Sequence, residues 1–308
     1  MKYLVPALVL FLNIGCNTIN TGSSAAATNI PDPDAVTITK TEVAKNFYLF
    51  QGPNGDFLAF VGADGVLLVD SEYETSAEQV RKEVAALSSK PVKYIINTHW
   101  HPDHVGTNVS FGKDGTTIIA HENTLKRLSS KQYTRFDKAT TLPIAEEGRP
   151  KKTYKTKMDL SFGGEQIEIF LAPNAHTDGD SVVYFRKSNI IELGDLYSNS
   201  AYPYLDLDSN GSIDALIAAM KKVAAMINKD TKVIAGHSNV SDLEEVKAYI
   251  AMLEDVRNKT NAMKQAGKTR DEILEANLSA EYNDTYFDDS YVKPNDFVSF
   301  VYDSSAVK

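Results

Sequence analysis

Residues 98–104 read T-H-W-H-P-D-H and gather four side chains that can bind a metal ion: His99, His101, Asp103 and His104. The spacing H-x-H-x-D-H arises by chance only roughly twice in ten thousand chains of this length and composition. Imidazole and carboxylate ligands without cysteine favour zinc, with iron and manganese as alternatives. This segment therefore predicts a metal site.

A strand expected at Val92–Asn97 leads directly into this motif. The alternate residues His99 and His101 can then point the same way and share one metal ion. Pro102 turns the chain, so that Asp103 and His104 can face a second metal nearby. Because two ligands do not hold a catalytic zinc, the remaining ligands must come from distant parts of the chain.

Three distant residues meet that need, and each follows a predicted strand. His176 lies in N-A-H-T-D-G-D, Asp195 closes I-I-E-L-G-D, and His237 ends V-I-A-G-H. Loops at strand ends gather at one rim of a sheet, where functional side chains concentrate. Five of the six histidines thus stand in positions that suit a metal centre.

The elements that must position these ligands alternate between strands and helices. The predicted strands are Val36–Lys40, Phe47–Gln51, Asp56–Val61, Gly65–Asp70, Thr117–Ala120, Gln166–Leu171, Ser181–Phe185, Ile190–Leu193 and 233–234. The predicted helices are Ser76–Leu87, Ile213–Ile227, Asp242–Ala266 and Asp271–Ala276. The first four strands should form an antiparallel meander, and residues 129–158 a long exposed loop. Two β-rich halves with helices predict an α+β domain over residues 36–308, with packed sheets and helices outside.

The N-terminus predicts export. Residues 1–16 combine Lys2 with a short apolar run that is too short to span a bilayer, as in a signal peptide. Cys16 follows Gly15 as in a lipobox, which predicts a lipid anchor in the periplasm or at the outer membrane. The alternative is a plain secretory signal with an incidental cysteine. Residues 17–35 are small and polar, which is typical of a flexible tether.

Composition narrows the partners. The 308 residues carry 32 basic and 41 acidic side chains, so the net charge is 32 − 41 = −9, which disfavours nucleic acid as a partner. Cys16 is the single cysteine, so the folded body needs no disulfide and offers a metal no thiolate. We therefore expect a small-molecule substrate, with membrane contact only through an anchor at Cys16.

The ordered set of H-x-H-x-D-H, a single His, G-D and a final His resembles the metallo-β-lactamase superfamily over nearly all of residues 36–240. The resemblance implies a four-layer αββα sandwich that holds two zinc ions. It implies His99, His101 and His176 for the first metal, Asp103, His104 and His237 for the second, and Asp195 as a bridge. It also makes Asp70 a buried carboxylate that orients a ligand histidine.

The same resemblance implies hydrolysis, with a hydroxide shared by two zinc ions attacking a carbonyl and Asp103 carrying the proton. The leading hypothesis is a cyclic amide or other activated carbonyl as substrate, with β-lactams the first class to test. Asp195 departs from the best-known β-lactamases, which use cysteine near this position, and is similar to hydroxyacylglutathione hydrolases and lactonases. The alternatives are therefore a lactone or thioester hydrolase, an iron-dependent relative, or a non-catalytic surface lipoprotein that binds a ligand.

Several further residues allow two interpretations. His121 either lines the site or caps a helix. The stretch from Asp206 to Gly211 imitates part of a calcium loop, but a polar turn before the helix at Ile213 explains it better. Asp178 and Asp180 either support the metal site or only form a turn. The remaining candidates, which either shape the substrate pocket or pack in an interface, are Tyr197, Tyr202 and Tyr204.

Overall fold

The computed structural model describes residues 37–287 and 291–306. The predicted signal peptide at residues 1–16 and the tether at residues 17–35 lie outside the described residues. Among the helices of the described ranges, none is both long enough and apolar enough to cross a bilayer.

A seven-stranded sheet is built from the N-terminal half, in the order β1-β2-β3-β4-β5-β6-β9. Its strands are β1 (Thr39–Ala44), β2 (Phe47–Gln51), β3 (Asp56–Gly62), β4 (Gly65–Val69), β5 (Val92–Ile96), β6 (Thr117–His121) and β9 (Lys152–Tyr154). The first four strands pair antiparallel, which confirms the predicted meander. The first strand lies further along the chain than the predicted 36–40. From β4 onward the pairing is parallel.

A five-stranded sheet follows, in the order β10-β11-β12-β13-β14. Its strands are β10 (Lys157–Phe162), β11 (Glu165–Ala172), β12 (Asp180–Phe185), β13 (Ile190–Glu192) and β14 (Lys232–Ile234). All pairs are antiparallel except β13 with β14, which run parallel. This parallel pair matters for function because both strands end at the same rim.

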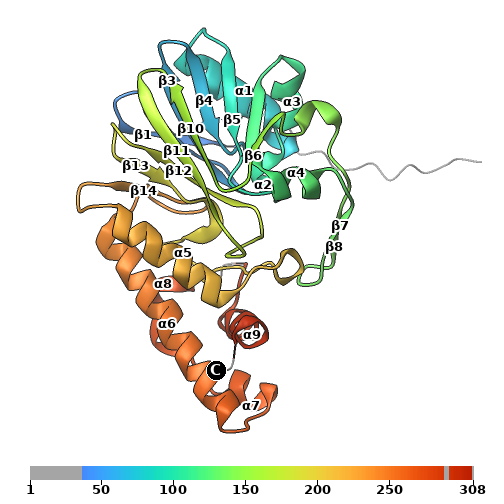
Figure 1. Ribbon diagram of the computed structural model, residues 1–308, viewed down its shortest axis with the longest axis vertical. Helices are drawn as coiled ribbons and strands as arrows, with labels where there is room; N and C mark the ends of the chain where they lie inside the picture. The colour runs from blue at the N-terminus through green and yellow to red at the C-terminus, as the bar shows by residue number, and fades with distance from the viewer. Residues whose placement is uncertain (1–36, 288–290, 307–308) are drawn as a thin grey trace, which may run out of the picture. The chain divides into compact units, whose positions relative to one another are not determined.

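The two sheets pack face to face and helices cover their outer faces (Figure 1). The helices are α1 (Ala77–Leu87), α2 (Pro102–Val105), α3 (Asn108–Lys113), α4 (Glu122–Leu128), α5 (Ile213–Met226), α6 (Leu243–Gln265), α7 (Arg270–Glu275), α8 (Asn283–Tyr286) and α9 (Pro294–Ser304). Phe47 and Phe60 of the first sheet meet Phe185 of the second in the central core. Val80 and Val84 of α1 cover the first sheet, and α5, α6 and α9 cover the second. The fold is the predicted four-layer αββα sandwich.

The prediction of a long loop over residues 129–158 was wrong in part. Residues 132–134 and 139–141 form the hairpin β7–β8 (Gln132–Thr134 and Ala139–Thr141), and Lys152–Tyr154 forms the edge strand β9. In the edge strand, one aromatic side chain rather than an aliphatic one makes the contact with the core. Tyr154 is buried in the central core, and its hydroxyl donates to Ser181 Oγ at 2.7 Å.

Candidate metal centre

The predicted ligands all lie just beyond strand ends of the two sheets. His99 follows β5, His101 is the N-cap of α2, and Asp103 and His104 lie in the single turn of that helix. His176 follows β11 in the second sheet. Asp195 lies in a short 3-10 turn (Gly194–Leu196) after β13, and His237 follows the neighbouring strand β14. The parallel pair β13–β14 thus delivers the last two ligands to the same rim.

The first donor set consists of three imidazoles and one carboxylate oxygen. Both His99 Nε2 and His176 Nε2 lie 3.0 Å from His101 Nδ1. Asp195 Oδ2 lies 3.8 Å from His99 Nε2 and 3.7 Å from His176 Nε2. Ligands of a tetrahedral zinc, with bonds of about 2.0–2.1 Å, stand roughly 3.3 Å apart, so this spacing fits the ion.

The outward nitrogens of these imidazoles are all engaged. His99 Nδ1 lies 3.0 Å from the Thr98 hydroxyl, His101 Nε2 lies 3.1 Å from Asp206 Oδ2, and His176 Nδ1 lies 2.8 Å from the Tyr204 carbonyl. A neutral imidazole that donates outward keeps a lone pair on its other nitrogen. Burial, together with neighbouring His101, lowers the pKa of His176 to about 4, so this ring is neutral. The inward nitrogens of the three rings therefore converge at one point, where a single metal cation would satisfy all of them.

The second donor set contains Asp103, His104, His237 and the other oxygen of Asp195. Asp103 Oδ2 lies 3.1 Å from both His104 Nε2 and His237 Nε2. Asp195 Oδ1 lies 3.3 Å and 3.5 Å from the same two nitrogens. Among the described residues, His104 Nε2 and Asp195 Oδ1 are buried atoms without a hydrogen-bond partner. Such orphaned atoms are rare in native proteins, and a bound metal ion would satisfy both.

Asp195 therefore serves both donor sets, one oxygen for each. Close packing fixes its position, because a Cβ on Gly236 would lie 2.2 Å from Asp195 Oδ1. The Gly236 carbonyl accepts a hydrogen bond from Asp56 N at 2.7 Å, which ties the loop of His237 to the first sheet. The two sheets thus hold this loop in place from opposite sides.

Asp70 is fully buried beneath the centre and organises its first ligands. Its carboxylate accepts from Thr98 N at 2.7 Å and from the Thr98 hydroxyl at 2.6 Å, and lies 2.8 Å from His104 Nδ1. Its backbone has a φ of +61°, a left-handed conformation that Asp and Asn tolerate better than most residues. Asp70 thus lies where the sequence resemblance places a ligand-orienting carboxylate.

Two other carboxylates near His176 have different roles. Asp180 is buried and accepts backbone hydrogen bonds from His176 at 2.8 Å and from Thr177, so it positions the ligand's turn. Asp178 pairs with Arg127 at 2.7 Å, which joins this turn to α4. His121 is the N-cap of α4 and accepts from Asn123 N, which confirms the capping interpretation.

Asp206 is the supporting residue that the sequence interpretation missed. It was assigned to a turn before the helix at Ile213, whereas the cap of that helix is Ser212. Asp206 instead caps the 3-10 turn Leu207–Ser209 and reaches back to His101. The D-L-D-S-N-G motif indicated a turn but gave no sign of a partner 105 residues away.

A cleft of about 800 Å³ opens above both donor sets. Four of the donor residues line its floor, and His237 is the most exposed of them: His101, Asp103, Asp195 and His237. Its walls include the β7–β8 hairpin and the loop after Asp195, whose tyrosines 197, 202 and 204 all line it. Those tyrosines therefore shape the cleft as well as packing in the core.

The αββα sandwich with two adjoining His/Asp donor sets at one rim defines a metallohydrolase-type centre. A profile of the metallo-beta-lactamase superfamily matches residues 54–237, which is more than half of the chain. The chain belongs to this superfamily.

Individual relatives differ in their chemistry. The alpha subunit of 2,4-dinitroanisole O-demethylase from Nocardioides sp. (strain JS1661) is 29% identical over 140 residues, 45% of this chain. Metallo-beta-lactamase IND-1 from Chryseobacterium indologenes is 25% identical over 198 residues, 63% of this chain and 77% of that protein. The structure of sec-alkylsulfatase Pisa1 from Pseudomonas sp. superposes with a TM-score of 0.66 and 14% identity over 86% of this chain. The chain spans only 40% of the demethylase subunit and 50% of the alkylsulfatase chain.

Proposed function

We propose that this chain is a di-zinc hydrolase that cleaves a cyclic amide or another activated carbonyl compound. The observation that carries the proposal is the division of the Asp195 carboxylate between two complete donor sets. When bound, zinc supplies a Lewis acid for the carbonyl oxygen and an activated water at neutral pH. Side chains of this protein would hold the metal ions, orient the ligands and transfer the proton.

Each of those side chains has a defined task. His99 and His176 are buried and hold the first site from behind, whereas Asp103 and His237 are partly exposed on the cleft floor. Asp103 is the acceptor for a proton from the attacking water and the donor to the leaving group. Asp70 and Asp206 hold His104 and His101 in the ring orientation that binding requires.

A lactone or thioester hydrolase is the second candidate. It is favoured by Asp195, which gives the centre a carboxylate where many β-lactamases carry cysteine. Iron or manganese in place of zinc fits the same ligands. Relatives that act on an ether, a β-lactam and a sulfate ester show that the fold itself does not select among substrates.

Elemental analysis of the purified mature domain, combined with hydrolysis assays before and after chelation, tests the proposal. We expect about two zinc ions per chain and chelator-sensitive turnover of a chromogenic cephalosporin or an uncharged lactone. Two metal ions without turnover of either compound would redirect the search to other esters and thioesters. A purified chain that binds no metal would contradict the hydrolase and revive the non-catalytic binding lipoprotein.

We further propose that the chain is exported and anchored through Cys16 in the periplasm or at the outer membrane. This rests on residues 1–16 alone, which combine a basic start, an apolar run and a cysteine after glycine. Mass spectrometry of the N-terminal peptide from a membrane fraction should find a lipid-modified Cys16. An unmodified peptide that begins after another cleavage point would contradict the anchor.

A further inference from the structure

Among the described residues, the walls of the cleft carry carboxylates but no lysine or arginine side chain. Neutral polar residues contribute much of the surface, including Asn54, Thr141, Ser198 and Ser200. The charged groups other than the histidines are all carboxylates, namely Asp103, Asp195 and Asp137. Two of these belong to the donor sets, so Asp137 is the additional charge.

Asp137 lies at the tip of the β7–β8 hairpin, where this hairpin borders the cleft. Its Oδ1 accepts hydrogen bonds from the Thr134 hydroxyl and from Ala139 N, the latter at 3.1 Å. These bonds fix the carboxylate in place at the mouth of the cleft. The Oδ1 atom of Asp137 therefore stabilises the hairpin turn, and the carboxylate places a negative charge on a wall of the cleft.

Two exposed tyrosines lie near this charge: Tyr291 forms a hydrogen bond with Asp137, and Tyr73 also lines the cleft. Tyr291 is 60% exposed and Tyr73 is 37% exposed, and both line the cleft. Partial burial, with the charges of Asp137 and Asp103 added, raises the pKa of the Tyr291 phenol. Partial burial and the charges of Asp103, Glu72 and Asp137 also raise the pKa of Tyr73. The same two carboxylates thus act on both phenols, which stay neutral and add no charge of their own to the mouth of the cleft.

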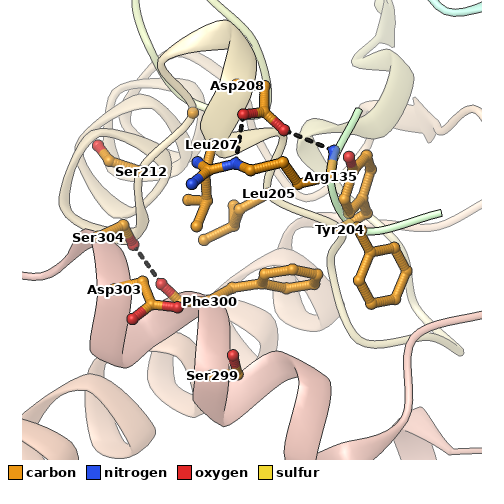
Figure 2. A pocket seen from close by; sticks show the side chains of 12 residues that line it. Arg135, Tyr204, Leu205, Leu207, Asp208, Ser212, Ser299, Phe300, Asp303 and Ser304 are labelled. Atoms are coloured by element: carbon orange, nitrogen blue, oxygen red, sulfur yellow. Dashed lines mark hydrogen bonds and ion pairs between the residues drawn. The ribbon is translucent and has the colours of Figure 1, made fainter. Parts of the chain in front are cut away.

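The basic residues beside Asp137 in sequence do not change this balance. Figure 2 shows Arg135 in a separate pocket, where its Nε donates to Asp208 Oδ1 at 2.6 Å. Its backbone nitrogen donates to the other oxygen of the same carboxylate at 2.8 Å. Lys138 is exposed and is not among the residues that line the cleft. Neither Arg135 nor Lys138 therefore adds a positive charge to the lining of the cleft.

We propose, building on the hydrolase function above, that this cleft favours uncharged acyl compounds over those with a carboxylate or sulfate near the scissile bond. An uncharged lactone should therefore be turned over faster than a cephalosporin, which carries a carboxylate beside its lactam. Asp137 is the specificity-determining residue. An anionic group that enters the cleft loses water and finds no lysine or arginine among the described wall residues to pair with, and it is repelled by Asp137. A neutral ester or lactone with an apolar or aromatic part avoids both costs and packs on Tyr73, Tyr204 and Tyr291.

A matched pair of substrates tests this selection. 4-Nitrophenyl methyl glutarate and its free carboxylate, 4-nitrophenyl hydrogen glutarate, differ only in the methyl group that masks the charge. For the metal-loaded wild type we expect kcat/KM to favour the methyl ester by roughly tenfold or more. Equal values, or a preference for the carboxylate, would overturn the proposal.

Variants separate the walls from the metal ions. Asp137→Asn keeps the Oδ1 acceptor of the hairpin and should raise kcat/KM for the carboxylate roughly threefold to tenfold, with little change for the methyl ester. Because wild type and variant share the same metal ligands, the attraction of the metal ions for an anion cancels in this comparison. Lys138→Ala is the matched control and should leave the preference unchanged. No gain in Asp137→Asn, or a loss of carboxylate turnover in Lys138→Ala, would refute the role of Asp137.

A binding measurement keeps this inference distinct from the hydrolase function. If neither ester is turned over, hydrolysis of this ester class is ruled out, but the selection can still be tested because the corresponding 4-nitroanilides can be titrated into the metal-loaded protein by calorimetry. The neutral methyl-glutaryl anilide should bind more tightly than the glutaryl anilide, and Asp137→Asn should narrow the gap. Tighter binding of the charged anilide to the wild type would overturn the inference by itself.

Discussion

The Asp206 carboxylate lies 3.1 Å from His101 Nε2 and so turns the Nδ1 atom of that imidazole toward the first donor set. Asp206 is fully buried, and its other oxygen accepts from the backbone nitrogens of Asp208 and Ser209, each at 3.1 Å. The neighbouring Trp100 reinforces the contact by donating from Nε1 to Ser209 Oγ at 3.1 Å. A single buried carboxylate thus joins a polar turn to a metal ligand.

Asp206→Asn should weaken the first metal site selectively. The amide oxygen can still cap the turn, but the amide nitrogen then faces His101 Nε2 and cannot accept its proton. We expect zinc affinity at the first site to fall roughly tenfold to hundredfold. Competition with a chromophoric chelator measures this loss. Asp208→Asn, on the same turn but paired with Arg135, is the control and should bind zinc as the wild type does.

Asp70→Asn should impair both stability and the second site. The carboxylate accepts from Thr98 and His104, and an amide cannot serve every one of those donors. We expect the free energy of unfolding to fall by roughly 1–3 kcal/mol and zinc occupancy to fall with it. Asparagine tolerates the left-handed backbone of position 70, so the change tests the hydrogen bonds rather than strain. Urea unfolding of the metal-free variant measures this loss. A free energy of unfolding equal to that of the metal-free wild type would contradict this account.

Asp103→Ala should separate the two metal sites. The first donor set does not include Asp103, so metal content should fall from about two ions to about one per chain. Turnover should fall by roughly a hundredfold or more, because the variant also lacks the proton carrier. Elemental analysis and steady-state kinetics measure the two effects. Retention of both metal ions at full occupancy would remove Asp103 from the second site.

Gly236→Ala should disturb the shared carboxylate. The new methyl group would meet Asp195 Oδ1 at 2.2 Å and His104 Cε1 at 2.7 Å, so both ligands must move. We expect loss of metal from the second site and a loss of turnover. Gly115→Ala is the contrasting variant, because a Cβ there meets no heavy atom within 4 Å although its φ is +88°. That variant should lower stability through backbone strain and leave metal content unchanged.

The sequence was sufficient for most of the architecture and for the residues that the structure brings together as two donor sets. Residues such as His176 and His237 follow strands whose apolar runs are plain in the sequence, and strand ends converge on one rim. Asp206 was assigned only to a turn because its contact with His101 depends on tertiary packing. Likewise, the sequence of Lys152–Tyr154 is typical of a polar loop. This segment is a strand because it pairs with the neighbouring strand β6, and the local sequence does not predict that pairing. Side chains that act across the fold therefore escaped prediction, whereas those set by local pattern did not.

Each donor set draws on both sheets, and this has a topological consequence. His99 and His101 follow β5 of the first sheet, whereas His176 and Asp195 follow β11 and β13 of the second. A metal ion held by all four closes a long chain loop between the halves and reduces the entropy of the unfolded state, as a disulfide does. The single cysteine lies at position 16, ahead of the folded body, so bound metal ions would provide the cross-link that thiols do not. Separation of the two halves of the sandwich would then require the metal ion to dissociate from the ligands of at least one sheet.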